Sequence, residues 1–335
     1  MSKKEKQVCC EKFKTMIGGQ ALIEGIMMRG PEKDAIVVRT NGELTVEVTP
    51  RKKRKAKSIA TWPFIRGVVG FFDSQVVGVK ALMRSADLSP EEAEMEAEPS
   101  KLDLWLEKKL GNEKFQKFVL GFAVFLGMAM SIGLFILLPG IVAGFFDVLI
   151  PNAFVLNLLE GLIRILIFVG YMLLVSRMKE MRRVFAYHGA EHKTIRCYEA
   201  GLELTVENVR QQTRLHPRCG TSFLLIVMVV SILLFSVASS GLLALIPALE
   251  AMRGQFLYRL IMIAFKLLLL PLVVGITYEI NRWAGRHDNA FTRVLTAPGM
   301  WFQNFTTVEP DDDMIEVGIA SLQAVLPEEA GADRW

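Results

Sequence analysis

The sequence predicts a mainly α-helical polytopic membrane protein with four transmembrane helices, a small N-terminal β-hairpin module and a C-terminal amphipathic helix. Hydrophobic residues make up 52% of the 335 residues, and the mean hydropathy is +0.34. Charged residues are crowded into a few stretches, and four segments exceed or approach the roughly 20 apolar residues that cross a bilayer core. The predicted spans are Phe118 to Phe146, Ala153 to Ser176, Gly220 to Leu249 and Tyr258 to Ile280.

Ionisable side chains interrupt two of these spans. Glu160 and Arg164 are four positions apart on the second span, so they can neutralise one another on one helix face. Lys266, on the fourth span, either reaches toward the outer headgroups or approaches Glu160. We interpret Glu160 and Arg164 as mainly structural; a small transporter that uses these two residues and Lys266 is an alternative function.

The distribution of Lys and Arg predicts the orientation. Short loops rich in these residues stay in the cytoplasm. The segment before the first span contains the basic run Arg51 to Lys57, and residues 177–221, between the second and third spans, are also strongly basic. The two opposite connections hold only Arg253 between them. We therefore expect both termini and residues 177–221 to be cytoplasmic, and the lysine-rich N-terminus lacks the pattern of a cleavable signal peptide.

Before the membrane domain, the sequence divides into four segments. The clearest local signal is Asn41-Gly42 between two β-rich runs, because this dipeptide favours the type I′ turn of a hairpin. The expected segments are a mobile basic tail (1–15), a cytoplasmic β-containing module (16–58), an amphipathic membrane-surface helix (59–86) and an acidic linker (87–100). A core helix packed on the module is the alternative for residues 59–86.

The predicted partners of this region are lipids. Each cation of the basic run near the surface would gain about 1 kcal/mol from anionic lipid headgroups. We therefore expect the lipid bilayer and its anionic headgroups as partners and no nucleic acid.

The membrane domain is expected over residues 101–280 and a cytoplasmic C-terminal segment over residues 281–335. In that segment, Asp311 to Asp313 precede apolar residues at helical spacing, which indicates an acid-capped amphipathic helix.

A glycine-rich stretch from Gly18 to Pro31 is the first candidate functional feature. We expect either a loop that covers a site, with Gln20, Glu24 and Arg29 as polar contributors, or a packing turn.

The strongest chemical signal lies in residues 177–221. His188 and His192 are four positions apart with Glu191 beside them, so a helix would offer both imidazoles to one metal ion, as in the inverted zincin motif. His216 and Cys219 follow before the third span, and one or both are expected to complete the protein ligands of the metal. Because cytoplasmic cysteines are kept reduced, we expect Cys219 to be a metal ligand and not part of a disulfide. Cys197 could replace Cys219 as a ligand, but it ranks lower. Glu279 is an additional candidate ligand; its alternative role is an ion pair with Arg282.

The number of ligands separates two functions. Imidazole and thiolate suit zinc; four protein ligands would make a closed structural site, whereas three leave a position for water. In the second case Glu191 would act as general base. The spacing favours that case and predicts a zinc-dependent hydrolase acting at the cytoplasmic face on a peptide or lipid-linked substrate. A non-catalytic scaffold with a structural metal is the main alternative.

Several ungapped strings resemble the YqhQ family of bacterial membrane proteins, a family described by a domain of unknown function. They are Gly18-Gly-Gln-Ala-Leu-Ile-Glu-Gly-Ile-Met-Met-Arg-Gly-Pro31, Tyr187-His-Gly-Ala-Glu-His-Lys-Thr194, His216-Pro-Arg-Cys-Gly-Thr-Ser222 and Pro298-Gly-Met-Trp301. The resemblance extends from about Gly18 to Leu326. It implies a multi-pass protein of the bacterial inner membrane and a predicted metal-dependent enzyme, without a substrate or protein partner.

Overall fold

The computed structural model describes residues 13–51, 58–89, 112–146, 149–150, 152–287, 289–329 and 331–334. Most of the predicted tail, the basic run after residue 51 and most of the acidic linker lie outside them. The chain forms two compact units, one of residues 1–90, 172–230 and 269–335 and one of residues 91–171 and 231–268.

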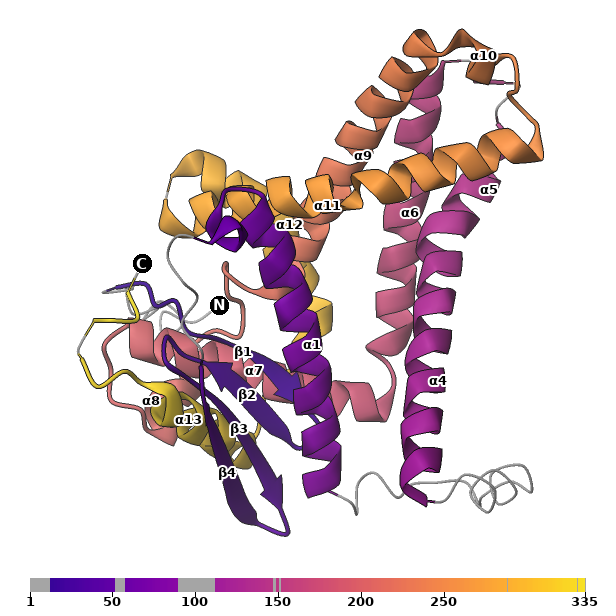
Figure 1. Cartoon of the computed structure of the whole chain (residues 1–335). Coiled ribbons are helices and arrows are strands. Elements are labelled where there is room, and N and C mark those ends of the chain that lie inside the picture. The colour runs from indigo at the N-terminus through magenta and orange to yellow at the C-terminus, as the bar shows by residue number, and fades with distance from the viewer. Residues whose placement is uncertain are drawn as a thin grey trace. The chain divides into compact units, whose positions relative to one another are not determined.

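The first unit contains an antiparallel sheet in the order β1-β2-β3-β4 (Figure 1). Its strands are β1 (Gly18–Leu22), β2 (Gly25–Arg29), β3 (Lys33–Thr40) and β4 (Glu43–Pro50). Asn41 and Gly42, between β3 and β4, have φ angles of 51° and 83°, which confirms the predicted hairpin. The glycine-rich stretch differs from the predicted loop: it forms the β1–β2 hairpin, in which Gly18 pairs with Arg29.

Alternating residues of the sheet pack against helices on its two faces, as the period of a strand requires. Ile26 and Met28 belong to the main core with α7 (Lys179–Glu199) and α13 (Asp312–Val325). Met27, between them, packs with Ala81 of α1 (Ile65–Leu88). Figure 1 shows α1 on the opposite side of the sheet from α7 and α13.

The remaining short elements of this unit flank these helices. The 3₁₀ helix η2 (Ile59–Thr61) precedes α1, and α8 (Val206–Arg210) follows α7. Asp311 caps α13 by accepting a hydrogen bond from Met314 N at 2.9 Å, so the predicted acid-capped helix is confirmed. Helix α1 packs on the sheet as a core helix does, while its outer face exposes Phe72 and Val76. Its contact with a lipid surface stays a prediction.

In the described residues, four helices are long and apolar enough to cross a membrane, in agreement with the number predicted. These candidate spans are Gly121–Gly144, Phe154–Val175, Gly220–Leu245 and Phe256–Arg286. Large apolar side chains such as Phe125 and Leu268 are exposed on them, as contact with lipid would require. The corresponding elements are α4 (Asn112–Ile132), a π-helical segment η3 (Gly133–Leu137), α5 (Leu138–Gly144), α6 (Ala153–Val175), α9 (Gly220–Leu245) and α11 (Phe256–Arg286).

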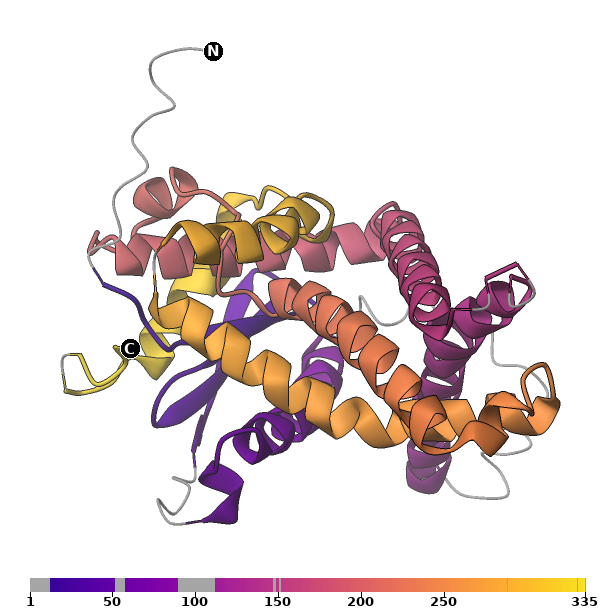
Figure 2. The ribbon, with the colours of Figure 1, turned by 90° about the horizontal axis from the view of Figure 1, so that it is seen from above.

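Two further helices lie in the C-terminal half of the described residues. The short α10 (Pro247–Glu250) lies between α9 and α11, and α12 (Ala290–Thr306) follows α11. The C-terminal end of α12 meets the middle of α7, where His188 contacts Thr306 (Figure 2).

Gly189 allows this close approach in the middle of α7. A Cβ atom at this position would lie 2.1 Å from Val308 O, a backbone atom that cannot move independently. We predict that Gly189→Ala destabilises the chain by roughly 1–3 kcal/mol, although alanine favours helices. Thermal unfolding of the detergent-solubilised chain measures the effect. Gly170→Ala in α6 is the matched control, since its Cβ would meet nothing within 4 Å; equal stability of the two variants would contradict the prediction.

Candidate metal centre

Helix α7 brings His188 and His192 together on one face. Their ring centroids are 4.3 Å apart, as the spacing of four residues predicts. Cys219, directly before α9, completes a group of three, whose ligand atoms all lie within 4.8 Å of one another. Its Sγ is 3.2 Å from Nε2 of His188. The structure thus joins three of the residues that the sequence selected.

The backbone around both rings fixes which nitrogen faces the cluster. His188 Nδ1 lies 2.8 Å from Thr306 O, and His192 Nδ1 lies 2.6 Å from Arg214 O. A carbonyl oxygen only accepts, so each Nδ1 carries a hydrogen, and in the neutral ring Nε2 keeps its lone pair. His192 Nε2 is buried and has no hydrogen-bond partner in the described part of the chain.

Electrostatics favours a thiolate at Cys219. Burial alone would raise its pKa, but the adjacent His192 and His188 outweigh burial and hold the pKa well below the ordinary value of a thiol. Burial likewise opposes a charge on His188, yet the neighbouring Cys219 raises the pKa of that imidazole to about 9. The thiolate is the form of cysteine that binds metals.

Glu191 lies beside the three candidate ligand residues, and one of its two carboxylate oxygens has a hydrogen-bond donor. Oε1 accepts a hydrogen bond from Gly19 N at 3.0 Å, whereas Oε2 is buried without a hydrogen-bond partner among residues the structure describes. Burial raises the pKa of Glu191, against the opposing effect of His188 and His192.

Gly19 reaches this carboxylate because it has no side chain. A Cβ atom there would lie 2.6 Å from Met27 O and 3.0 Å from Glu191 Cδ. Gly19 is not among the polar residues predicted as contributors from this stretch, because its role depends on its backbone N–H. The signal available was the pair of adjacent glycines, which indicates close backbone approach.

His216 lies near the group but is not part of it. Its Nε2 is 3.3 Å from Glu199 Oε2, and its backbone N–H donates to Gln303 Oε1 at 2.7 Å. Burial, together with the positive charge of Arg218, lowers the pKa of His216 well below its ordinary value, so the ring is neutral. Glu199 is fully buried and accepts hydrogen bonds from Arg218 and from Thr15 N.

The other predicted site residues have partners elsewhere. Glu279 is not in the group of three; it accepts a hydrogen bond from Arg66 Nε at 2.7 Å, instead of pairing with Arg282 as its alternative role proposed. Glu24 binds Arg183 and the hydroxyl of Tyr187, Arg29 binds Asp34 and Asp73, and Cys197 is buried in a separate small core with Val209 and Ile315.

The cluster opens into a cavity of about 400 Å³ within the first unit. Strand β1 contributes Gly19 and Gln20 to its wall, and the start of α9 contributes Thr221 and Leu224. Gln20 is thus the only one of the three predicted polar contributors that lines this cavity in the described residues.

The fold and this cluster define a class: a mainly helical protein with four candidate membrane spans and a His/Cys group that could hold a metal ion. The chain belongs to the family described as "Protein of unknown function (DUF1385)", which matches residues 62–328. It is 32% identical over 330 residues to "Uncharacterized protein YqhQ" of Bacillus subtilis (strain 168), covering 93% of each chain. No solved structure matches it. The resemblance to the YqhQ family is therefore confirmed, but nothing in these descriptions supports the metal-dependent enzyme that it implied.

The buried Glu199 links His216 to the rest of the fold. We predict that Glu199→Ala destabilises the chain by about 3–5 kcal/mol, because it removes a buried carboxylate from a cationic partner, Arg218. Chemical unfolding measures the loss. Glu207→Ala, an exposed position of α8, should change stability by less than about 0.5 kcal/mol. Similar free energies of unfolding for the two variants would show that the buried Glu199–Arg218 pair does not contribute to stability.

Proposed function

We propose that this chain is a zinc-dependent integral membrane enzyme, a hydrolase that acts at the cytoplasmic face on a peptide or lipid-linked substrate. One observation carries the proposal: two imidazoles and a thiol converge beside Glu191, whose buried Oε2 has no hydrogen-bond partner within the described residues. The four groups line one cavity, where a substrate could reach them.

The donor set supports zinc. Zinc binds imidazole nitrogen and thiolate sulfur, whereas calcium and magnesium prefer oxygen. Zinc bond lengths place the nitrogen and sulfur ligands of one tetrahedral ion about 3.5 Å apart. The separation of 3.2 Å between His188 Nε2 and Cys219 Sγ is close to that value. Both Nδ1–H groups are directed at backbone carbonyls, which is the usual support of a metal-binding histidine.

The number of ligands supports catalysis. A structural zinc site takes four protein ligands, and this group offers three. His216, the nearest further imidazole, is held by Glu199. With three protein ligands, zinc supplies a Lewis acid and an acidic water near neutral pH. Glu191 has a carboxylate oxygen free to take a proton there, and its raised pKa suits a general base.

The apolar helices and the charge distribution support the location. Four candidate spans favour a membrane protein, and the excess of Lys and Arg in residues 177–221 favours the cytoplasmic face. Leu224 and Thr221, in the first turns of α9, border the cavity. A substrate bound in this cavity would therefore lie close to the start of a candidate span. This position suits a lipid-linked group or a peptide near the membrane.

A structural metal that connects α7 to the start of α9 is the competing function. It requires a fourth protein ligand, and His216 is the residue that would have to leave Glu199 to supply it. Metal content and mutant phenotypes separate the two proposals.

Elemental analysis of the purified full chain tests the ligand set. We expect one zinc per chain in the wild type and near-complete loss in His188→Gln and Cys219→Ser, because each variant removes one of three ligands. His216→Gln should retain zinc, and His287→Gln is the matched control outside the group. Absence of zinc from wild-type protein prepared without chelators would remove the proposal; loss in His216→Gln, with the protein still folded, would favour the structural site.

Glu191→Gln tests catalysis separately from metal binding. We expect this variant to keep zinc and its melting temperature, while hydrolysis falls by about 10²–10⁴-fold because the general base is gone. A panel of ester and peptide substrates, together with complementation of a strain lacking the chromosomal copy, provides the readout. Glu180→Gln, exposed in the first turn of α7, is the control. Wild-type complementation by Glu191→Gln would refute the catalytic role.

A further inference from the structure

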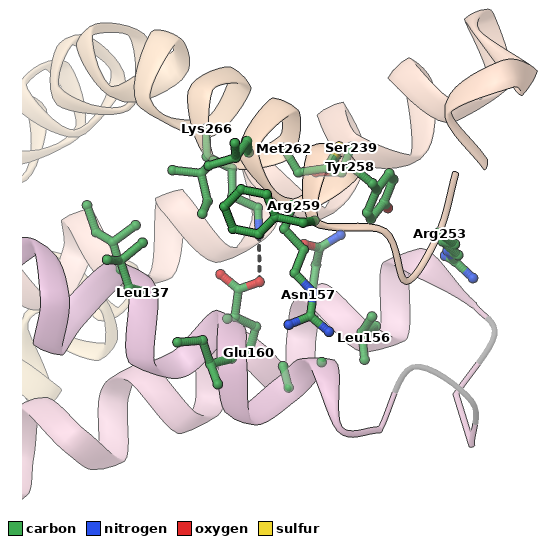
Figure 3. A pocket seen from close by; sticks show the side chains of 18 of the residues that line it. Leu137, Leu156, Asn157, Glu160, Ser239, Arg253, Tyr258, Arg259, Met262 and Lys266 are labelled. Carbon is green, nitrogen blue, oxygen red and sulfur yellow. Dashed lines mark hydrogen bonds and ion pairs between the residues drawn. The ribbon is translucent and has the colours of Figure 1, made fainter. Parts of the chain in front are cut away.

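The second unit contains its own cavity, separate from the candidate metal centre. Its volume is about 420 Å³, within the range of small-molecule sites. Figure 3 shows Glu160, Lys266 and Arg259 among the side chains that line it. Most of the wall is apolar and comes from η3, α5, α6, α9 and α11. Typical apolar lining residues are Leu137, Ile141, Leu156, Leu243 and Met262.

Positive charge exceeds negative charge around this cavity. Glu160 Oε1 accepts a hydrogen bond from Arg164 at 2.7 Å, and its Oε2 accepts one from Lys266 at 2.6 Å. The ion pair predicted from the sequence therefore exists, and Lys266 takes the predicted approach to Glu160. One carboxylate thus serves two cations, each with a side chain only 11% exposed.

Arg259 adds a further cation to the wall of the cavity. Its guanidinium forms no hydrogen bond or ion pair within the described ranges, and it lines the cavity. Arg259 and Lys266 are seven positions apart, which is about two helical turns, so they share one face of α11. Met262 and Ile263 lie between them on that face. The face is cationic at both ends and apolar in the middle.

Ser239 supplies an independent observation. Its side chain is fully buried and lines the cavity, yet its hydroxyl has no hydrogen-bond partner in the part of the chain described. The neighbouring Ser236 and Ser240 donate to helix carbonyls at 2.7 and 2.9 Å, the usual arrangement of a serine in an apolar helix. Ser239 is therefore a donor available to a ligand.

We propose that this cavity binds an anionic phospholipid, with its phosphate at the cationic face of α11 and an acyl chain along the apolar wall. Cationic groups and an unpaired hydroxyl donor match phosphate oxygens, and the excess positive charge in an apolar setting favours an anion. A free phosphate ion would satisfy the charges but leave the apolar wall without contacts. This site shares no residue with the candidate metal centre, so it stands or falls independently.

Native mass spectrometry of the full chain in a neutral detergent tests the site. Phosphatidylglycerol and phosphatidylcholine with identical acyl chains are compared, and inorganic phosphate is added in a separate arm. We expect at least about fivefold preference for phosphatidylglycerol, since each cation near the headgroup favours it by about that factor. Arg259→Gln should abolish most of this preference. Ser239→Ala should weaken binding of phosphatidylglycerol, whereas the matched control Ser240→Ala should leave it unchanged.

Three outcomes would overturn the proposal. They are equal binding of the two lipids by the wild type, an undiminished preference in Arg259→Gln, and displacement of the lipid by equimolar inorganic phosphate. The last result would identify a free anion as the ligand. A size-exclusion profile identical to that of the wild type establishes that each variant is folded.

Discussion

The first unit depends on the burial of a polar helix. From Phe185 to its C-terminal residue Glu199, α7 is largely buried, although this part contains Glu191, His192 and Lys193 as well. A buried polar group needs a hydrogen-bond partner, because burying it without one destabilises the fold by more free energy than a typical hydrogen bond contributes. The partners come from distant parts of the chain: Gly19 in β1, Arg214 and Arg218 before α9, Thr306 at the end of α12, and Glu309 before α13. These contacts determine where each segment lies around α7.

Within the described residues, the two candidate sites differ in the kind of group that each offers to a ligand. At the candidate metal centre, His192 Nε2 and Glu191 Oε2 are acceptors without a hydrogen-bond partner among the described residues, and a cation would satisfy them. In the cavity of the second unit, the Arg259 guanidinium and the Ser239 hydroxyl have no hydrogen-bond partner among the described residues, and both can donate. Acceptors and donors call for ligands of opposite charge. The same rule of hydrogen-bond satisfaction therefore supports a metal ion in one place and a lipid phosphate in the other.

Local patterns were predictable from the sequence, and remote partners were not. The spacing of His188 and His192, the turn at Asn41-Gly42 and the Asp311 cap each depend on neighbours within one element, so the periodicity of helix or strand suffices. Glu279 meets Arg66 across 213 positions, and Gly19 meets Glu191 across 172. Spacing cannot reveal which distant backbone approaches a side chain. Of the five candidate ligands predicted from the sequence, His188, His192 and Cys219 therefore lie together, whereas His216 and Glu279 contact other partners.

The position of Cys219 directly before α9 gives the cluster a mechanical property. Helix α9 behaves as a stiff rod, so an axial displacement of its first turn is transmitted to Sγ with little loss. Metal sites tolerate deviations of only about 0.2 Å in their bond lengths. A candidate span also adjusts its depth and tilt to the thickness of the surrounding bilayer. In a chain that spans the membrane as proposed, a change in the depth or tilt of α9 would therefore change the distance between Cys219 and the histidines of α7.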